Sequence, residues 1–203
     1  DARPITQEVQ RAEQAIALAK RGLTVAVVSS GDCGIYGMAG LVLECLASQN
    51  WDTAALPVDV FPGITALQAI ASRVGAPLMH DFCAISLSDL LTPWDVIQKR
   101  LIAAAKADFV TALYNPRSRT RQKGIEIALK IFRQCRPAET PVAIARSLYR
   151  DDESIHITTL DKLDVTQIDM LTTVLIGNQS TRLYGDRLIT PRGYAVRSED
   201  SVE

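Results

Sequence analysis

Apolar residues along this chain follow a helical period in some segments and a strand period in others, and the two kinds of segment alternate. Helical spacing predicts a first helix that ends at Gly22, a residue suited to a C-terminal cap. A run of β-branched residues then predicts a strand over 24–29, followed by a helix near 37–48. A second strand is expected over 58–61 and a further helix over 64–74. The beginning of the chain is therefore expected to form an α/β structure.

The same alternation continues from Phe82 onward. Helical spacing predicts one helix that carries Trp94 and another that carries Phe132. The expected strand over 154–158 alternates polar and apolar residues, which is typical of a half-exposed antiparallel strand. A mixed sheet is therefore expected here, with strands over 82–87, 109–114, 141–146, 154–158 and 172–176.

These elements fall into two sets, which predict two domains. The boundary is expected near His80, at a proline-containing link, so that the first domain spans 1–80 and the second 81–194, with a polar, frayed tail over 195–203. The first domain has only two strand patterns, and two strands with helices cannot bury both faces of a sheet. Either further strands precede this chain, or the first domain depends on the second domain and on a partner.

Composition narrows the classes of function. The chain has 203 residues, 47% of them hydrophobic, which is enough for a sizeable core and argues against disorder. Its net charge of -1 gives no basic field for nucleic acid, and no apolar run approaches the ~20 residues that span a bilayer. The four cysteines are widely spaced without a C-x-x-C pair, which favours reduced thiols in a cytoplasmic protein over disulfides or zinc.

The stretch VAVVSSGDCGIYGMAG, over 25–40, carries the most informative chemistry. Gly34, Gly37 and Gly40 have the spacing G-x-x-G-x-x-G, which differs from the dinucleotide fingerprint G-x-G-x-x-G. Glycines after a strand let the backbone approach a ligand closely, so a small-molecule cleft is expected. Asp32 lies between strand and helix, where its carboxylate either caps the helix or binds the amine or hydroxyl of a polar ligand.

Small and polar residues follow most of the expected strands. In a parallel arrangement these strand ends would share one edge and line a cleft, although each alone is also ordinary turn chemistry. The residues concerned are Gly31-Asp32, 62–66, Asn115-Pro116, Arg146-Ser147 and Gly177-Asn178.

Basic residues gather in NPRSRTRQK, the junction between a strand and a helix over 115–123. Most charge runs are solvated surfaces, but this one follows a strand end, where arginines suit an anionic substrate such as a polycarboxylate or a phosphate. The basic residues are Arg117, Arg119, Arg121 and Lys123.

Two pairs near the expected boundary are candidates for proton transfer. These pairs are His80-Asp81 and Ser88-Asp89, although neighbours on a loop seldom face one another, so a structural role is the simpler interpretation. Cys33 is either a reactive thiol at a helix N-terminus or a small packing residue, and His156 is expected on the surface. The chain holds no G-x-S-x-G, H-E-x-x-H or Walker motif.

Six blocks of the sequence carry a family resemblance: SSGDCGIYGMAG, FPGITAL, GAPLMHDFCAISLSDLLTPWDVI, ALYNPRSR, DMLTTVLIGN and ITPRGY. Together they resemble the tetrapyrrole methyltransferases of cobalamin biosynthesis, from about Glu8 to Tyr194. The resemblance implies two α/β domains of the tetrapyrrole methylase type, with S-adenosylmethionine in a cleft between them. It also implies a cytoplasmic homodimer that methylates a carbon of a precorrin, with contraction of the ring.

The resemblance further implies roles for individual residues. The acidic groups of the macrocycle are expected at Arg117, Arg119 and Arg121. Candidates for the proton transfers of ring contraction are Asp32, His80 and Asp89. Cofactor contacts are expected from Ser30, Gly31, Asp32, Ile35, Thr65, Ala66, Asn115, Ser147, Leu148, Thr190 and Pro191.

The chain departs from the family pattern in two places. Family members begin with a strand that ends in G-x-G-P-G, and no such block is present, so we expect a truncated enzyme whose activity as a fragment is open. Cys33 stands where relatives often have Pro or Ala. The alternatives are another methyltransferase of the same family, acting at a different ring carbon, and a nucleotide-binding or non-catalytic α/β module.

Overall fold

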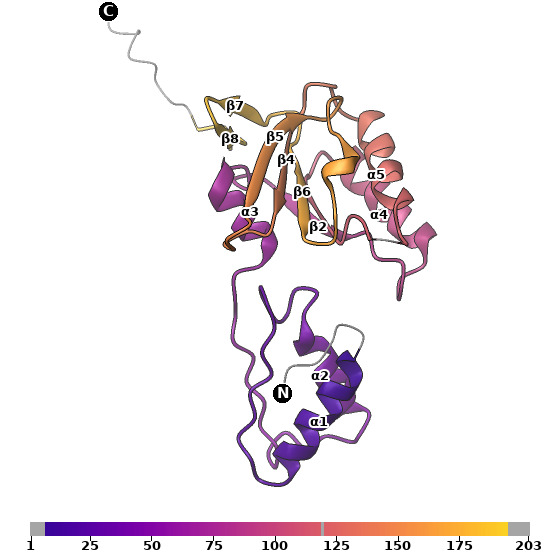
Figure 1. Ribbon diagram of the computed structural model, residues 1–203, viewed down its shortest axis with the longest axis vertical. Coiled ribbons are helices and arrows are strands. Elements are labelled where there is room, and N and C mark those ends of the chain that lie inside the picture. Colours follow the sequence, from indigo (N-terminus) through magenta and orange to yellow (C-terminus); the bar gives the residue numbers. More distant parts are fainter. Residues whose placement is uncertain (1–6, 119, 195–203) are drawn as a thin grey trace, which may run out of the picture. The chain divides into compact units, whose positions relative to one another are not determined.

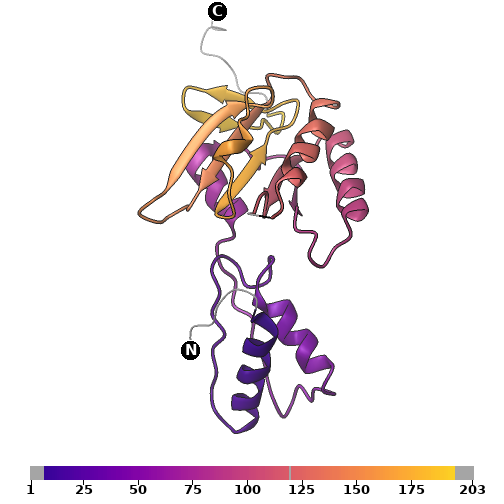
Figure 2. The same ribbon diagram turned by 45° about the vertical axis from the view of Figure 1, so that its right-hand side comes forward.

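The computed structural model describes residues 7–118 and 120–194, which divide into two compact units (Figures 1 and 2). Unit 1 ends at Thr65 and unit 2 begins at Ala66. We expected the division near His80, but it falls earlier in the chain. The reason is that the helix that follows Thr65 packs on the sheet of unit 2. The expected frayed tail over 195–203 lies outside the described residues.

Unit 1 contains two helices that pack against each other, α1 (Glu8–Lys20) and α2 (Met38–Ala47). Their buried residues are Ala12, Ile16, Met38 and Leu46. The predicted end of the first helix is confirmed, because Gly22 has a φ of 85° and its N–H donates to the carbonyl of Ala19.

The strands predicted over 24–29 and 58–61 are not formed. Both segments have no regular secondary structure, as Figure 1 shows, and the described part of unit 1 holds no strand. Val28 is 81% exposed and Phe61 is 78% exposed, so the β-branched and aromatic side chains of these segments have no sheet to bury them. Two isolated strands cannot make a stable sheet, which is the physical reason for the wrong prediction.

Unit 2 is built on a five-stranded mixed sheet, and all five strands predicted for it are confirmed within one residue at either end. β2 pairs parallel with β3, whereas β6 is antiparallel to both β3 and β4, and β5 is antiparallel to β4. Consequently β2, β3 and β4 run in one direction and β5 and β6 in the other. The order across the sheet is β2 (Phe82–Ser86), β3 (Val110–Tyr114), β6 (Thr172–Ile176), β4 (Pro141–Arg146) and β5 (Ser154–Thr159).

Helices cover both faces of this sheet (Figures 1 and 2). On β4, Val142 and Ile144 pack in the core under α4 and α5, whereas Ala143 and Ala145 pack in the core under α3. The small alanine side chains leave room for α3 to lie close to the sheet, and this packing assigns α3 to unit 2. The helices are α3 (Ala66–Val74), α4 (Trp94–Lys106) and α5 (Lys123–Arg133).

A small second sheet completes unit 2, and a short 3-10 helix, η1 (Val165–Gln167), precedes β6. The strand order in the second sheet is β1 (Gly75–Ala76), β8 (Arg187–Ile189) and β7 (Arg182–Tyr184), with β1 parallel to β8. A side chain at Gly75 would collide with the carbonyl oxygen of Leu188, which explains the glycine at this position. We expected 75–77 only to interrupt the pattern, because strands this short leave no periodic signal.

Candidate functional site

Strand direction decides which of the expected site residues share an edge of the sheet in unit 2. The carboxyl ends of β2, β3 and β4 lie at one edge, which brings Ser86, Asn115 and Ser147 to that side. β6 runs the opposite way, so Gly177-Asn178 lies at the other edge and the expected convergence of every strand end is wrong there.

In unit 1, the carboxylate of Asp32 joins two loops that are far apart in the sequence. Its Oδ1 accepts a hydrogen bond from the N–H of Gly34 at 2.7 Å, and its Oδ2 accepts one from the N–H of Gly63 at 2.9 Å. These hydrogen bonds, from Gly63 first and Gly34 second, lower the pKa of Asp32. Asp32 does not cap α2, whose N-terminal cap is Gly37 without a side-chain hydrogen bond. We call this arrangement the Asp32 clamp.

The two loops of the Asp32 clamp also touch through their backbones. A Cβ atom at Gly63 would overlap the carbonyl oxygen of Gly31, so only glycine permits this approach. Cys33 adds a third connection, because its Sγ lies 3.2 Å from the carbonyl oxygen of Phe61. That contact supports the packing interpretation of Cys33. Ser30 and Ile35 are exposed beside the junction, and Thr65 ends the second loop.

At the edge of unit 2, two residues that directly follow strands adopt the left-handed conformation. Asn115 has a φ of 50° and Ser147 a φ of 51°. The side-chain amide of Asn115 donates to Oγ of Ser86 at 3.0 Å, which connects the ends of β3 and β2. A left-handed non-glycine residue is uncommon and costs about 1–3 kcal/mol, and such residues cluster at ligand sites. Their occurrence after β3 and β4, two strands that run in the same direction on either side of β6, marks this edge as a candidate site.

The turn that begins at Ser147 is held by a network of charged side chains. Arg146 donates from Nε to Oδ2 of Asp169 at 2.8 Å and from Nη1 to Oδ2 of Asp152 at 2.7 Å. The hydroxyl of Ser147 donates to the same oxygen of Asp152 at 3.0 Å. The hydrogen bonds from Arg146 and Ser147 lower the pKa of Asp152. We call this set the Arg146 network.

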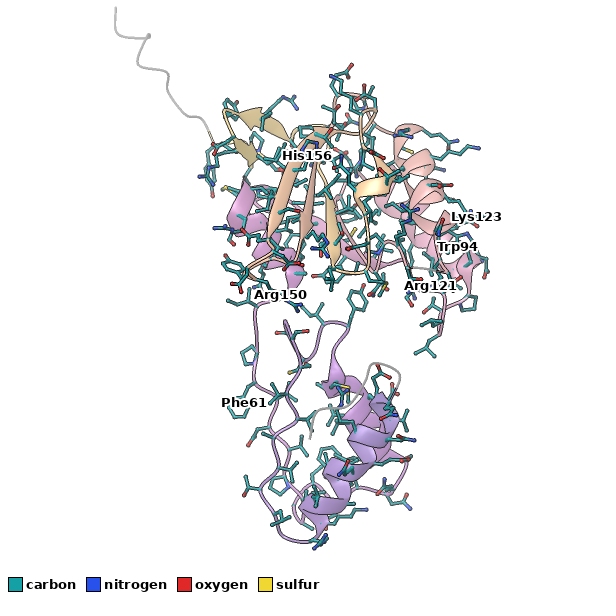
Figure 3. The ribbon with its side chains drawn as sticks, in the orientation of Figure 1. Phe61, Trp94, Arg121, Lys123, Arg150 and His156 are labelled. Carbon is teal, nitrogen blue, oxygen red and sulfur yellow. The ribbon has the colours of Figure 1, made fainter. Side chains whose placement is uncertain are left out.

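A second arginine, on α3, holds the same turn from the other side. Arg73 pairs with the carboxylate of Glu153, and Oε2 of Glu153 accepts from the N–H of Tyr149 at 2.7 Å. Tyr149 is itself left-handed, with a φ of 60°, and its hydroxyl lies 2.9 Å from that of Ser72. Figure 3 shows Arg150, in the same turn, at the end of the sheet where these groups lie. The acidic run over 151–153, in the turn directly before β5, is the sequence signal that could have identified this turn.

The predicted substrate arginines are engaged in contacts within unit 2. Nη1 of Arg117 donates to the carbonyl of Val165 at 2.7 Å, which ties it to η1. Arg121 lies 3.9 Å from a carboxylate oxygen of Asp89 and also contacts the sulfur of Met170. Figure 3 shows Arg121 and Lys123 near Trp94. Arg119 lies outside the described residues.

The structure separates His80 from Asp89, another proton-transfer candidate, within unit 2. His80 precedes β2, whereas Asp89 follows it, so the two lie at opposite edges of the sheet. The exposed His80 accepts a hydrogen bond at Nδ1 from the N–H of Asp81 at 2.8 Å. It therefore contacts its neighbour rather than the edge that carries Asn115 and Ser147. His156 is part of β5, as expected.

The remaining predicted cofactor residues have different surroundings. Thr190 is fully buried, and its hydroxyl lies 2.8 Å from that of Thr181, in the turn after β6. Pro191 is exposed and Leu148 is partly buried against the core under α3. The contacts predicted for these residues stay predictions.

Metal-binding groups and membrane-spanning helices are absent from residues 7–118 and 120–194. No group of three His, Cys, Asp or Glu side chains in these ranges has a geometry that suits a metal ion. None of the helices described there is long and apolar enough to cross a membrane. The four cysteines are unpaired. The Asp32 clamp and the edge that carries Asn115 and Ser147 are thus the best-defined candidates, and both consist mainly of backbone groups and small polar side chains.

The chain is similar to known methyltransferases that act on tetrapyrrole macrocycles. Residues 2–164 match the family model of the tetrapyrrole (corrin/porphyrin) methylases. The chain is 51% identical over 191 residues to a cobalt-factor III methyltransferase of Priestia megaterium, covering 94% of this chain but only 35% of that protein. It is 42% identical to a precorrin-3B C(17)-methyltransferase of a Sinorhizobium species, covering 95% of this chain and 78% of the relative.

Solved structures show the same relationship. The crystal structure of the methyltransferase CobJ is similar with a TM-score of 0.86 and 40% sequence identity, over 91% of this chain and 77% of that one. A uroporphyrin-III C-methyltransferase from Thermus thermophilus, complexed with S-adenosylhomocysteine, has a TM-score of 0.58 at 17% identity over 84% of this chain and 74% of that one, and shows the fold alone.

Proposed function

The chain belongs to the tetrapyrrole (corrin/porphyrin) methylase family, and from this membership we propose that it transfers a methyl group from S-adenosylmethionine to a carbon of a precorrin-type macrocycle. The name of one relative, a precorrin-3B C(17)-methyltransferase, supports carbon 17 of precorrin-3B, and the name of another supports its cobalt-containing counterpart, cobalt-factor III. We propose in addition that the ring contracts and that the reaction is a step of cobalamin biosynthesis. The chain spans only 35% of the length of the cobalt-factor III methyltransferase, so we propose this activity for the chain on its similarity to part of that protein.

The observation that carries the proposal is the Asp32 clamp. Gly63 lies against the carbonyl of Gly31, which keeps side chains out of the junction and leaves backbone groups beside the exposed Ser30 and Ile35. These residues suit a ligand such as S-adenosylmethionine, whose adenosyl and amino-acid parts carry hydrogen-bonding groups all along their length. We propose cofactor contacts from Ser30, Gly31, Asp32, Ile35 and Thr65 in unit 1 and from Ala66, Asn115, Ser147 and Leu148 in unit 2.

The chemistry requires little from the protein beyond orientation. S-adenosylmethionine, when bound, would supply a methyl group on a positively charged sulfur: an electron-rich carbon would form a bond to the methyl carbon in line with the methyl–sulfur bond, which would break and release S-adenosylhomocysteine. Alignment of reacting groups is worth about 7–11 kcal/mol, and charge that disperses during reaction suits a site of low polarity. Asp32 matches this requirement, since its carboxylate accepts from the N–H groups of Gly34 and Gly63 and so joins two loops. The task of the proposed residues is to fix the backbone and exclude water.

The proton transfers of ring contraction need a separate group. Asp32 has both carboxylate oxygens occupied by backbone N–H groups and a lowered pKa, so we propose that it holds the loops rather than moves a proton. His80 lies at the other edge of the sheet from Asn115. Asp89 remains the candidate at the correct edge, beside Arg121.

We also propose a cytoplasmic homodimer. The exposed apolar side chains of unit 1 support a further contact, because Val28, Val60, Phe61 and Ile64 are each at least half exposed. Sedimentation velocity of the chain at several concentrations measures this directly. A single species with the mass of one chain at all concentrations contradicts it.

The proposed reaction is tested with the chain itself. Isothermal titration with S-adenosylhomocysteine should give one site per chain, and incubation with S-adenosylmethionine and precorrin-3B or cobalt-factor III should add one methyl group to the macrocycle. NMR of the product locates the new methyl group. Methylation at another ring carbon would refute the finer assignment, and absence of both binding and transfer would refute the enzymatic function of this chain.

A further inference from the structure

The first turn of α3 is hydrogen-bonded to the end of a strand that leads into the candidate edge of unit 2. The N–H of Leu67 donates to the hydroxyl of Tyr114 at 2.7 Å, and Tyr114 ends β3 directly before Asn115. An N–H group in the first turn of a helix has no partner within the helix. The hydroxyl of Tyr114 therefore supplies, from 47 residues away, an acceptor that this end of α3 requires.

The side chain of Tyr114 is fixed at both its ring and its hydroxyl. Its ring packs against the core under α3, which includes Leu67 and Ile70. Asn115 follows in the left-handed conformation, with a φ of 50°, and its amide donates to Oγ of Ser86 at 3.0 Å. Because this backbone conformation is unfavourable by itself, it depends on contacts that hold the residues on either side. The contact between Tyr114 and α3 is one of them.

The other end of α3 holds the turn over 147–153. The hydroxyl of Ser72 lies 2.9 Å from that of Tyr149. Arg73 lies over the ring of Tyr149, 5.4 Å from its centroid, and donates from Nε to Oε1 of Glu153 at 3.0 Å. One helix thus contacts both of the segments that contain a left-handed residue at this edge.

The carboxylate of Glu153 connects α3 to the backbone of that turn. While Oε1 accepts from Arg73, Oε2 accepts from the N–H of Tyr149 at 2.7 Å. The hydrogen bonds from Tyr149 and from Arg73 lower the pKa of Glu153, so the carboxylate is charged at neutral pH. The side chain of Glu153 is only 15% exposed, which shields this ion pair from solvent better than a pair on an open surface. Leu148, in the same turn, packs against the core under α3.

We propose that α3 positions the edge of unit 2 at which the cofactor binds, with Tyr114, Arg73 and Glu153 as positioning residues that act through their neighbours. Tyr114 fixes Asn115 relative to the start of α3, and the pair of Arg73 and Glu153 fixes the turn that begins at Ser147. This inference rests on the proposed function. It adds residues for which no contact with the cofactor is proposed.

The test measures the affinity of the full chain for S-adenosylhomocysteine by titration calorimetry. Loss of a positioning contact lowers the fraction of chains whose loops are arranged for binding, and the dissociation constant rises in proportion. Tyr114→Phe removes only the hydroxyl and should weaken binding about fivefold. Arg73→Gln and Glu153→Gln should each weaken binding about tenfold, and Arg73→Lys, which keeps the charge, should recover part of the affinity.

A double substitution tests whether Arg73 and Glu153 act as a pair. If they do, the variant with both Arg73→Gln and Glu153→Gln should bind no more weakly than either single variant, because the same interaction is already lost in each. Independent effects would multiply to a loss of about a hundredfold, and that result would contradict the pairing.

A general loss of stability is distinguished from a loss of positioning by urea unfolding followed by Trp94, in unit 2. A variant that is more than about 99% folded without urea cannot lose affinity tenfold through global unfolding. We expect all the single variants to meet this condition and to keep one binding site per chain. Loss of affinity that only accompanies a measurable unfolded fraction would contradict a positioning role.

Matched controls come from exposed positions of unit 2. Tyr184→Phe removes a hydroxyl on β7, and Arg100→Gln removes a charge on α4, so both should bind within about twofold of the parent chain. The inference is overturned if Tyr114→Phe and Arg73→Gln bind as well as these controls, while a parent chain that binds S-adenosylhomocysteine keeps the proposed function. A parent chain that binds no S-adenosylhomocysteine refutes the proposed cofactor site and this inference together.

Discussion

The two units respond differently to the same kind of sequence. Val110–Tyr114 forms the buried strand β3 in unit 2, whereas the β-branched run over 24–29 in unit 1 pairs with nothing. β3 has a neighbour on each side and helices on both faces, and the run in unit 1 has neither. The difference shows that a strand-like sequence indicates only a preference for the extended conformation. A strand forms only where neighbouring strands pair with the segment.

The difference extends to how each unit holds its candidate site. Unit 1 fixes its loops with the single carboxylate of Asp32 and a close backbone approach at Gly63. Unit 2 fixes its loops on a sheet edge with the Arg146 network and a second arginine on α3. Substitutions should therefore have local, severe effects on the proposed ligand site of unit 1 and distributed effects in unit 2.

The largest effect on stability is expected in unit 2, from Arg136→Met. The side chain of Arg136 is fully buried, donates to the carbonyls of Gly177 and Phe109, and lies over the ring of Phe132. Its removal leaves the buried carbonyl oxygen of Gly177 without this donor and the carboxylate of Asp108 without its ion-pair partner, and it should lower the free energy of unfolding of unit 2 by roughly 3 kcal/mol. Urea unfolding followed by Trp94 measures this loss, and the unfolding transition followed by Trp51, in unit 1, should not move. An effect no larger than that of Arg100→Met would contradict this account.

The largest effect on ligand binding is expected in unit 1, from Gly63→Ala. The added methyl group would overlap the carbonyl oxygen of Gly31. The atoms that it meets belong to the backbone, which cannot rotate away as a flexible side chain could. We expect the affinity for S-adenosylhomocysteine to fall about a hundredfold, measured by titration calorimetry, with the Trp94 unfolding transition unchanged. The control is Gly40→Ala in α2, where a methyl group meets nothing within 4 Å. Equal affinities for the two variants would show that the Asp32 clamp is not part of the cofactor site.

A smaller effect is expected from Arg146→Lys. A lysine keeps the charge but cannot hold Asp169 and Asp152 together, so the turn at Ser147 should loosen. Affinity for S-adenosylhomocysteine should fall roughly tenfold. Arg100→Lys changes an exposed arginine on α4, and it should leave the affinity unaltered. The expectation fails if the two lysine variants bind equally well.

The smallest effect is the pH dependence contributed by Asp32. Its pKa is lower in the folded chain than the unfolded value of about 3.9, because Gly63 and Gly34 donate to the carboxylate. Its contribution to stability is therefore present above pH 4 and lost as the pH falls through the folded pKa. Trp51 unfolding curves between pH 6 and pH 3 should show this loss in the parent chain and not in Asp32→Asn. Identical pH profiles would contradict it.

Much of unit 2 was predictable from local pattern. The central strands pack residues on two covered faces, as Val142 and Ala143 illustrate, and such burial leaves a short continuous apolar run bounded by turn residues. The direction of β6 was not predictable, since antiparallel placement depends on pairing with β3 and β4. That single uncertainty led to the wrong expectation for Gly177-Asn178.

The candidate site was predictable only in part. Asp32 stood out because a carboxylate interrupts a glycine-rich loop after an apolar run. Its partner Gly63 is 31 residues away, and no local rule predicts that contact. The same holds for Arg73 and Glu153, which are 80 residues apart. Long-range pairs of this kind come from tertiary packing, and a single sequence carries no signal for them.

The most direct test of the central claim is a crystal structure of the chain with S-adenosylhomocysteine. We predict that the ligand contacts the backbone of residues 30–32 and of Thr65, with Asp32 still accepting hydrogen bonds from Gly34 and Gly63. A ligand bound elsewhere, with these residues free of contact, would contradict the account.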